Sequence, residues 1–545
     1  MTTTRLLACS SFIALAMTAL PAAAFAQDAE QTNAGADSEE AVGGEIIVTA
    51  RKREESVKDI PSTITALTDE QLEAKGPIEG VGDLLQSVPG VRFNGLQSEN
   101  LAEVSVRGSG TQRATSADSG VGLFVNGAYV GSSTLGGRNF KRIDYFDLAR
   151  IEVLEGPQGA LYGRNSEFGT VNIVLAEPAF RDGGRGSAVY TNELGQMRLE
   201  GIVNKAVNET VAVRFGAQVT GQSKGFYYNP NQEKYYDHTD GWIARGQIRY
   251  SDGPLEVKLL VDAMDMNLPT FVNQFVLPAG QLPVLPLGYT GPRYDVPRDG
   301  KDGVHQKVQR AMLTAVYDFD WAELTSTSMA LRSVSEQDFS AAIDLATQAQ
   351  FQQQGQRGVY PLGQTSTYAR NKTLYQDLRL AGDASDALSW LVGFEGLLQD
   401  DFYTRDSATS PCALTLNAGI CGGTPNQPIC YKLTPNARDC PTPFPFVFGS
   451  RRETPSKYRS GAIYGSLKYD IGDLSLSGEL RYSRDHKTAT QTDYDLYTTN
   501  LAAAPSTVSF TQGNFSYSAT AGYRLYAPVP VLLYAKTGSG YRAGG

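Results

Sequence analysis

The segment Leu474-Ser-Leu-Ser-Gly-Glu-Leu-Arg-Tyr-Ser483 alternates apolar or glycine positions with serine and charged positions. Successive side chains of a β-strand point to opposite faces of a sheet, so the segment predicts a strand with one apolar face and one charged face. Residues 211–219 alternate in the same way. Alternation and turn signals together predict about thirteen such strands between residue 186 and the end of the chain.

The connections between these predicted strands differ regularly in length. Short links such as Asn208-Glu209 alternate with long ones, at residues 223–241, 267–307, 335–372, 404–459 and 483–514. A soluble sandwich also has two-faced strands, but tight turns at one end and long loops at the other are typical of an outer-membrane β-barrel. Five aromatic residues near strand ends are candidates for its membrane-interface girdles: Trp242, Trp321, Trp390, Tyr469 and Tyr526.

The composition excludes several classes of protein. The 545 residues include 48 Lys plus Arg and 58 Asp plus Glu, which gives a formal charge of −10. Nucleic-acid binding leaves a basic footprint that this chain lacks. Hydrophobic residues make up 41% of the chain, and the one long apolar run lies at the N-terminus, so a bundle of transmembrane helices is excluded.

The N-terminus has the pattern of an export signal. Residues 1–26 contain Arg5, an apolar stretch over residues 6–20 and the small-residue site Ala24-Phe25-Ala26. This pattern predicts a signal peptide cleaved after Ala26.

Four cysteines then remain in the mature chain, at Cys412, Cys421, Cys430 and Cys440. Their spacing lacks the C-x-x-C pairs of zinc sites, so we expect no metal there. In an exported protein such a cluster predicts two disulfides within one loop, and three connectivities stay open.

The next segment, residues 27–56, is expected to be a flexible leader. Residues 27–44 have no apolar period and cannot bury a core. They lead into the β-prone run Glu45-Ile46-Ile47-Val48-Thr49-Ala50 and the charged residues 51–55. Such a run can add a strand to another protein's sheet or can form the first strand of the following domain, and composition leaves both readings open.

Residues 57–178 combine short strands and helices and predict a compact α+β domain. A helix start is expected at residues 68–71 and a second short helix at residues 81–85, before the stop at Val88-Pro89-Gly90. The dipeptide Asn126-Gly127 between two apolar runs predicts a tight hairpin. The strand region is expected to occupy residues 185–545.

Three motifs in this α+β domain are similar to those of one known family. They are Ser105-Val-Arg107-Gly108, Phe124-Val-Asn126-Gly127 and Arg150-Ile-Glu-Val-Leu-Glu-Gly-Pro-Gln-Gly-Ala-Leu-Tyr-Gly-Arg-Asn165. With the run at residues 45–50, they closely resemble the plug and TonB box of TonB-dependent outer-membrane receptors over about residues 45–178. The strand region resembles the barrel of the same receptors.

The resemblance implies a mainly β protein in which an α+β plug lies inside a transmembrane antiparallel β-barrel. It implies that Glu45, Ile46, Ile47, Val48, Thr49 and Ala50 form the TonB box. The plug-motif positions are Arg107, Gly108, Asn126, Gly127, Glu152, Glu155, Gly156, Pro157, Gly159, Tyr162, Gly163, Arg164, Asn165, Gly169 and Asn172. A barrel of about 22 strands has a lumen wide enough to need such a plug.

The resemblance also implies a function: energised uptake of a scarce large solute across the outer membrane. The inner-membrane protein TonB would pull on the box, gripping residues 46–49 by strand addition. The family base rate favours a ferric siderophore as ligand, with carbohydrate, cobalamin-like and other aromatic ligands left open. Ligand contacts are expected near residues 109–120 and 131–140 and in the Gln-rich loop at residues 348–354.

Further expectations concern partners and alternative functions. We expect a monomer surrounded by outer-membrane lipid, with no cofactor and no nucleic-acid partner. The chain has no G-x-S-x-G, H-E-x-x-H or P-loop motif, so an enzyme is not expected. A passive porin or adhesin, or an inactive fragment, is the alternative, although a porin needs neither box nor plug.

The sequence departs from the family pattern in three places. Glu155 stands where the family usually has an Arg that is thought to bond barrel carboxylates, so we expect a barrel Arg or Lys as its partner. Phe168-Gly169 stands where a Gly-Gly pair is usual. Arg107 and Arg164 stay as candidate anchors between plug and barrel.

The third departure is the number of strands. Thirteen strands are fewer than about 22, and closure of the barrel would need roughly 250 more residues, so we expect the sequence to be truncated at its C-terminus.

Overall fold

The computed structural model describes most of the chain after residue 45. The described residues are 46–49, 51–74, 81–85, 87–95, 102–110, 119–131, 142–229, 233–269, 302–340, 363–409, 420–424, 427–431, 448–495, 501–526 and 531–542. All of them belong to one compact unit, residues 46–545. The predicted signal peptide lies outside the described residues. Within them, no helix has the length and apolar character needed to cross a membrane.

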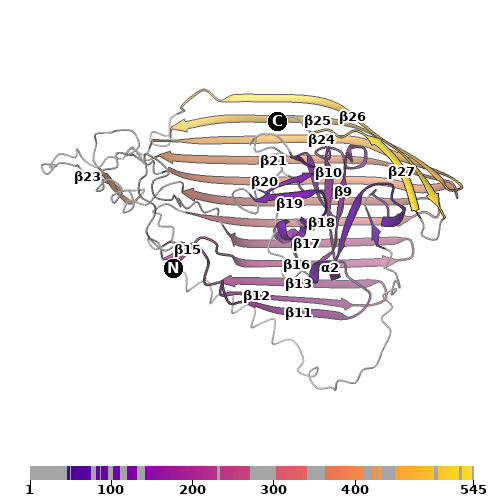
Figure 1. Cartoon of the computed structure of the whole chain (residues 1–545), viewed down its shortest axis with the longest axis horizontal. Helices are drawn as coiled ribbons and strands as arrows, with labels where there is room; N and C mark the ends of the chain where they lie inside the picture. Colours follow the sequence, from indigo (N-terminus) through magenta and orange to yellow (C-terminus); the bar gives the residue numbers. More distant parts are fainter. Residues whose placement is uncertain are drawn as a thin grey trace, which may run out of the picture. The chain divides into compact units, whose positions relative to one another are not determined.

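A single antiparallel sheet of thirteen strands dominates the structure (Figure 1). In spatial order its strands are β11 (Gly183–Thr191), β12 (Gln196–Ala206), β13 (Val211–Gln222), β16 (Asp240–Asp252), β17 (Leu255–Leu268), β18 (Gly303–Asp318), β19 (Glu323–Ser340), β20 (Gly363–Ser385), β21 (Leu388–Thr409), β24 (Phe448–Ile471), β25 (Leu474–Asp495), β26 (Ser506–Leu525) and β27 (Val531–Gly538). This order follows the sequence, and β11 and β27 form the two edges. The mainly β fold with about thirteen strands is confirmed, and the sheet is not closed.

Several strands are longer than the alternation pattern predicted. Strands β20, β21 and β24 contain 23, 22 and 24 residues. They extend into segments expected to be loops: β24 begins at Phe448, inside the predicted loop 404–459. The ladder continues because backbone groups still need partners, whereas the hydrophobic alternation fades where both faces are polar.

The two faces of the sheet differ as the alternation predicted. On β25, Leu476, Leu480 and Tyr482 are 41%, 54% and 50% exposed, whereas Arg481 and Ser483 are buried. The exposed apolar face also carries aromatic residues near the short turns, where the Trp321 and Trp390 rings stack with centroids 6.3 Å apart. The charged face is therefore the covered one, which is the reverse of a soluble sandwich.

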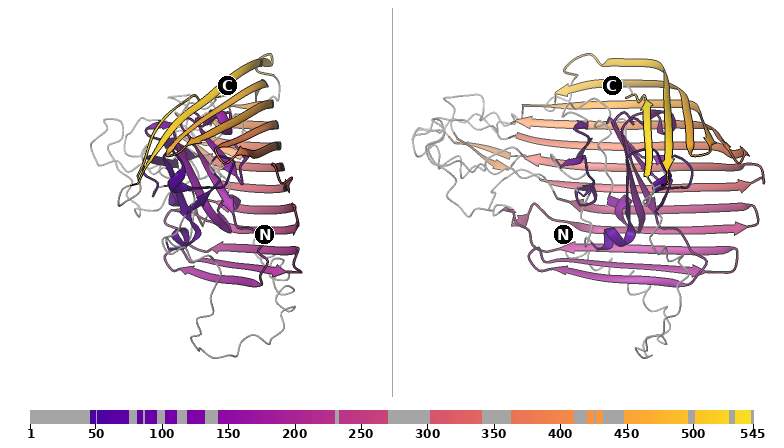
Figure 2. Two further views of the ribbon diagram at one scale, coloured as in Figure 1. Left: turned by 90° about the vertical axis from the view of Figure 1, so that its right-hand side faces the viewer. Right: turned by 45° about the vertical axis from the view of Figure 1, so that its right-hand side comes forward.

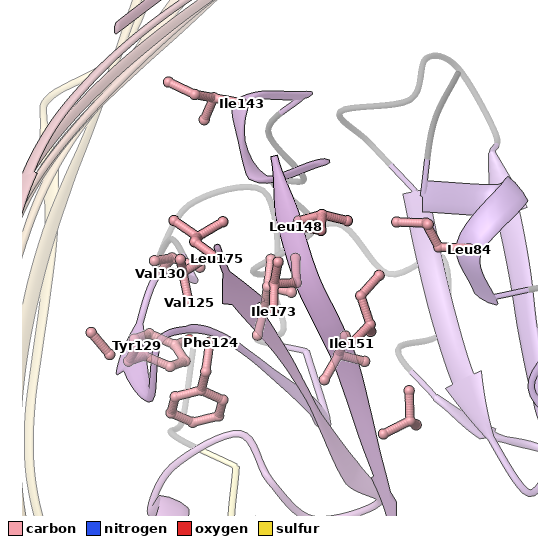
Figure 3. Close-up of a cluster of buried hydrophobic side chains, with 14 of the residues drawn as sticks. Leu84, Phe124, Val125, Tyr129, Val130, Ile143, Leu148, Ile151, Ile173 and Leu175 are labelled. Carbon is pink, nitrogen blue, oxygen red and sulfur yellow. The ribbon is translucent and has the colours of Figure 1, made fainter. Parts of the chain in front are cut away.

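The N-terminal part of the unit is an α+β domain. Its five-stranded sheet has the order β3 (Ile64–Thr68), β9 (Leu148–Glu155), β10 (Gly169–Leu175), β7 (Val121–Val125) and β8 (Ala128–Tyr129). A three-stranded sheet contains β4 (Val91–Gly95), β5 (Ala102–Val106) and β6 (Ser109–Gly110). Figure 3 shows its apolar core, which includes Phe124, Ile151 and Ile173.

Two of the short helices, α2 (Asp69–Glu73) and α3 (Val81–Leu85), begin where the sequence predicted them. Helix α2 (Asp69–Glu73) follows Thr68, whose hydroxyl accepts a hydrogen bond from the Gln71 amide at 3.4 Å, and the two residues form a reciprocal capping box. Helix α3 spans Val81–Leu85 and α4 spans Gly159–Tyr162. Two 3₁₀ turns, η1 (Val57–Asp59) and η4 (Arg142–Tyr145), complete the helical elements among the described residues.

This α+β domain covers the charged face of the large sheet (Figure 2). Gln399 on β21 donates a hydrogen bond to the Gly131 carbonyl at 2.6 Å, and Arg245 on β16 donates one to the Ile143 carbonyl at 2.8 Å. We call the charged face of the thirteen-stranded sheet the inner face and the exposed apolar face the outer face.

Three small hairpins complete the fold. They are β1 (Ile47–Val48) with β2 (Glu55–Ser56), β14 (Tyr228–Asn229) with β15 (Lys234–Tyr235), and β22 (Ile420–Thr424) with β23 (Gln427–Tyr431). The last hairpin places the backbone of Cys421 directly opposite that of Cys430. Cys412 and Cys440 lie outside the described residues, and the disulfides stay a prediction.

Candidate functional site

The motif at residues 150–165 folds into one continuous structure. Strand β9 runs through Glu155, the chain turns at Gly156, helix α4 follows, and β10 returns antiparallel to β9. Gly156 and Gly163 have φ of 85° and 74°, in the region that favours glycine. The Gly156 amide donates a hydrogen bond to the Phe168 carbonyl at 2.9 Å, which joins the two ends of the connection between β9 and β10.

The other two motifs are tight hairpin turns, as predicted for Asn126-Gly127. Asn126 and Gly127 have φ of 47° and 76° between β7 and β8, and Arg107 and Gly108 have φ of 52° and 78° between β5 and β6. Two residues with positive φ match the right-handed twist of the strands that they join. The Asn172 side chain accepts a hydrogen bond from the Gly127 amide at 3.0 Å, which fixes the first turn against β10.

The predicted TonB box is a strand of a hairpin in this structure. Ile47 and Val48 pair with Ser56 and Glu55, and the Val57 amide donates to the Ile46 carbonyl at 2.9 Å. Val48 is fully buried and Ile47 is 43% exposed. Glu45 and Ala50 lie outside the described residues. Of the two sequence-based readings, this structure shows the box as a strand paired within its own chain.

Glu152 joins the box to the long plug motif. Its buried carboxylate accepts hydrogen bonds from the Thr49 amide at 2.8 Å, from Asn172 Nδ2 at 3.0 Å and from Arg150 Nε at 2.8 Å. Charge-assisted hydrogen bonds of this kind are the strong ones. The last described residue of the box is therefore held by the middle of β9.

Lys52, in the turn after the box, reaches the inner face of the large sheet. Its ammonium lies 3.0 Å from Asp377, 3.5 Å from Glu395 and 3.1 Å from the Tyr464 hydroxyl. Burial alone would lower the pKa of Lys52, but the Asp377 carboxylate, the Tyr464 hydroxyl and the Glu395 carboxylate together outweigh it and hold the pKa above its ordinary value. Lys52 is therefore a buried, charged link between the box hairpin and strands β20, β21 and β24.

The residues on either side of Lys52 also contact the large sheet. Arg51 forms an ion pair with Glu479 on β25 at 3.2 Å, and Arg53 donates to the Trp390 carbonyl on β21. Three successive basic residues thus bind four neighbouring strands. Sequence reasoning treated residues 51–55 only as a charged stretch and did not predict these contacts.

Glu155 has a different partner from the one expected. Its carboxylate lies 2.7 Å from Arg107 Nε, and Arg107 also donates to the Thr63 hydroxyl at 2.9 Å. All three residues belong to the plug. The expectation of a barrel partner for Glu155 is therefore wrong, because Arg107, at the positive-φ turn after β5, already lies beside the end of β9. Arg107 likewise shows a plug partner, not a barrel one.

Arg164, the other candidate anchor, does contact the sheet. Its guanidinium lies 3.9 Å from the ring centroid of Tyr458 on β24. Asn165 donates to the Tyr129 hydroxyl at 2.9 Å, and Tyr162 packs edge-on against Phe124. Burial raises the pKa of the Tyr162 phenol well above its ordinary value.

The remaining motif residues serve the turns and the close packing of α4. Pro157 is exposed in the turn before α4. A Cβ at Gly159 would lie 2.8 Å from the Gly540 Cα, and one at Gly169 would lie 2.5 Å from the Leu154 carbonyl oxygen. These two glycines are required by close approach, not by a turn.

A second group of ion pairs between plug and sheet was not predicted from the sequence. Asp144 in η4 lies 2.7 Å from Arg310 on β18, and Asp147 lies 2.6 Å from Arg214 on β13. Here the plug supplies the carboxylates and the sheet supplies the arginines. Nothing in a single sequence pairs residues more than sixty positions apart, although an isolated Arg on the inner face of a strand is a signal for a buried partner.

Two family models match the chain. The TonB-dependent Receptor Plug Domain matches residues 56–170, and the TonB dependent receptor-like β-barrel matches residues 264–545, more than half of the chain. The chain belongs to the TonB-dependent receptor family. The predicted boundaries at residues 27–56, 57–178 and 185–545 stay predictions.

Curated relatives of this TonB-dependent receptor align over part of their length. The Vitamin B12 transporter BtuB of Photobacterium profundum is 29% identical over 164 residues, which is 30% of this chain and 24% of the relative. The Ferric enterobactin receptor PirA of Pseudomonas aeruginosa is 27% identical over 180 residues, 30% of this chain and 22% of the relative. The matched region thus spans about a quarter of the length of these relatives.

Solved structures share the fold at low sequence identity. The ferric yersiniabactin uptake receptor FyuA from Yersinia pestis superposes with a TM-score of 0.61 at 16% identity, covering 87% of this chain and 64% of that chain. The open form of the Ferric-Catecholate import receptor Fiu from E. coli K12 gives 0.61 at 15% identity, covering 92% and 73%.

In this TonB-dependent receptor, the predicted box, the turn after it, the plug motif and the sheet form one polar cluster. The predicted box is hydrogen-bonded to Glu152 of the plug through Thr49, and the turn after it is bonded to the sheet through Lys52. A force applied at the predicted box must therefore break the hydrogen bond to Glu152 and the ion pairs of Lys52 with the sheet before it moves the rest of the plug.

Proposed function

We propose that the chain acts in energised uptake, with TonB gripping the box at residues 45–50 and pulling on the plug. The observation that carries this proposal is the bond between Thr49 and Glu152, which attaches the box directly to the central strand pair of the plug. The family supports a TonB partner, and a backbone strand is a suitable handle because its hydrogen bonds share the load.

The grip requires the box to leave its hairpin. Ile47 and Val48 pair with β2 in this structure, and Val48 is buried. Strand addition to TonB would replace these backbone hydrogen bonds with equivalent ones, so the exchange costs chiefly the burial of Val48 and the contacts of Thr49 and Lys52. Release of the box is therefore the step at which ligand binding on the far side of the plug can act.

A ferric siderophore is the ligand that we propose. The names of several relatives support it: the ferric enterobactin receptor PirA, the ferric yersiniabactin receptor FyuA and the ferric-catecholate receptor Fiu. The predicted ligand-contacting segments lie largely outside the described residues. A corrinoid is the second candidate, because three curated relatives are vitamin B12 transporters.

The box assignment is tested with Ile47→Pro, and Ile47→Ala serves as the matched control. Proline removes a backbone donor and fixes φ, whereas alanine shortens the same exposed side chain and keeps the backbone intact. We expect Ile47→Pro to abolish energised uptake and leave ligand binding unchanged, while Ile47→Ala retains most uptake. Equal uptake by Ile47→Pro and the wild type would reject the box.

The ligand assignment is tested by equilibrium binding of ferric enterobactin, of the same siderophore without iron, and of cyanocobalamin. We expect binding of the ferric form alone. Binding of cyanocobalamin alone would replace the siderophore by a corrinoid and leave the box proposal standing, because the two experiments have separate readouts.

A further inference from the structure

A row of basic side chains crosses the outer face of the large sheet. Arg332 on β19 lies directly opposite Lys372 on β20, Lys372 lies opposite Asp400 on β21, and Asp400 lies opposite Lys457 on β24. Two further basic residues lie next to this row, Arg459 on β24 and Arg484 on β25. We call Arg332, Lys372, Lys457, Arg459 and Arg484 the basic row. All five are exposed, and their positions alternate with buried residues of the inner face.

The five cations of the basic row form no close ion pair within the part of the chain that the structure describes. None of them forms an ion pair or a hydrogen bond with another described residue, and Asp400 is the one carboxylate within the row. Like charges directly opposite each other on neighbouring strands are destabilising, and Arg332 faces Lys372. Such an arrangement favours an external anion that neutralises the row.

The basic row marks one boundary of the apolar band on the outer face. Between the basic row and the short turns, the strands carry exposed apolar residues: Leu374, Leu378, Val392, Phe394, Leu398, Ile463, Leu467, Leu476, Leu480 and Tyr482. The opposite boundary is aromatic, with Tyr469 on β24. Ten residues separate Tyr469 from Arg459, or about 33 Å along a strand. At a tilt near 40° this is about 25 Å along the membrane normal, the height of the lipid-facing band of a barrel.

An apolar groove adjoins the basic row on the same side of the sheet. It has a volume of about 580 Å³, and its lining includes Leu313, Ala330, Leu374, Gly396 and Leu398. Ala330 and Leu374 are each two residues along the strand from a basic row member, Arg332 and Lys372. Because side chains two apart share a face, the groove begins where the charges end.

We propose that the basic row and this groove bind a membrane lipid whose phosphate headgroup carries a net negative charge. Lysine and arginine bind phosphate oxygens through charge-assisted hydrogen bonds, and the groove accepts an acyl chain. An acidic protein would not need the groove, and a free anion would not need it either. The row lies on the side of the apolar band that faces the long connections, so the lipid belongs to the leaflet on that side.

The size of the effect follows from the number of cations. A basic residue near a membrane surface contributes about 1 kcal/mol to the binding of an anionic lipid, which is roughly a fivefold change in affinity. Neutralising Lys457 alone should weaken binding about fivefold. The combined variant Lys372→Gln, Lys457→Gln and Arg459→Gln should weaken it on the order of a hundredfold.

Arg451 provides a matched control. It is an exposed arginine on the same strand, β24, but its guanidinium already pairs with Asp406 at 2.6 Å. Arg451→Gln removes one positive charge from β24, as Lys457→Gln does, but the charge that it removes is already paired with Asp406. We expect this variant to bind lipid like the wild type.

The test is native mass spectrometry of the full chain in neutral detergent micelles doped with phosphatidic acid or phosphatidylcholine. We expect retention of phosphatidic acid over phosphatidylcholine, a graded loss in the Lys457→Gln and triple variants, and no loss in Arg451→Gln. Equal retention of the two lipids, or equal loss in Arg451→Gln and Lys457→Gln, would overturn the proposal. So would inorganic phosphate bound in undoped micelles as tightly as phosphatidic acid, since the site would then need no lipid.

Discussion

Replacing Lys52 with methionine should loosen the box hairpin without disturbing the rest of the plug. Methionine keeps the length of the side chain and removes the charge that lies between Asp377 and Glu395. Lys58, an exposed lysine in η1 next to the hairpin, supplies the control variant Lys58→Met.

The structure sets the size of this effect. Breaking a buried ion pair by removing one partner costs about 3–5 kcal/mol when the other charge is left alone. Here Asp377 keeps the Tyr464 hydroxyl at 2.6 Å and Arg379 at 3.1 Å, and Glu395 keeps Arg481 at 2.6 Å. We therefore expect a smaller loss of about 1–3 kcal/mol, which corresponds to a rise of about 5- to 150-fold in the population of the released box.

Hydrogen exchange of the peptide covering residues 46–57 measures this population. The Thr49 and Val57 amides are protected by bonds to Glu152 and Ile46, so their exchange reports opening of the hairpin. We expect faster exchange in Lys52→Met and wild-type exchange in Lys58→Met. Equal protection in all three proteins would refute the reasoning. A rise of the same size throughout β9 and β10 would refute it too, because the effect would then be a general loss of plug stability.

The same contact predicts how the hairpin responds to pH. The pKa of Lys52 is raised, so its stabilising contribution is fully present below the unfolded value of about 10.4 and is lost only as the pH rises through the folded value. After correction for the intrinsic dependence of exchange on pH, the advantage of the wild type over Lys52→Met should be constant across the neutral range and should shrink only in strong base.

Two further predictions concern the plug motif and the cysteine loop. Gly163→Ala should destabilise the plug by roughly 1–3 kcal/mol, because its φ is 74° and the added Cβ would lie 2.7 Å from the buried Arg481 guanidinium. Gly127→Ala shares the positive φ but meets open space, so a chemical denaturation series should show a smaller loss; equal losses would argue against the contact. Directly opposed antiparallel residues have Cα atoms about 4.5–5.5 Å apart, within disulfide range, so non-reducing peptide mapping should link Cys421 to Cys430. A link from either to another cysteine would contradict this register.

The sequence by itself determined the local and periodic features of this protein. Alternation along residues 474–483 predicted a two-faced strand, Asn126-Gly127 predicted a hairpin, and Thr68 predicted a helix start, and each is confirmed. These features depend on residues close in the chain, so a single sequence contains the information. The motif at residues 150–165 indicated the family for the same reason.

Only the tertiary structure decided which distant charges meet. Lys52 and Asp377 are 325 positions apart, and the sequence pattern gave no sign of their contact. Glu155 was expected to need a partner in the sheet, yet Arg107 lies beside it because the turn after β5 packs against the end of β9. A buried charge must find an opposite charge, but which one it finds depends on how the strands are threaded past one another. The local sequence of each strand therefore determined which of its faces is apolar. The ion pairs and hydrogen bonds that join the predicted box, the plug and the sheet depend on the tertiary structure.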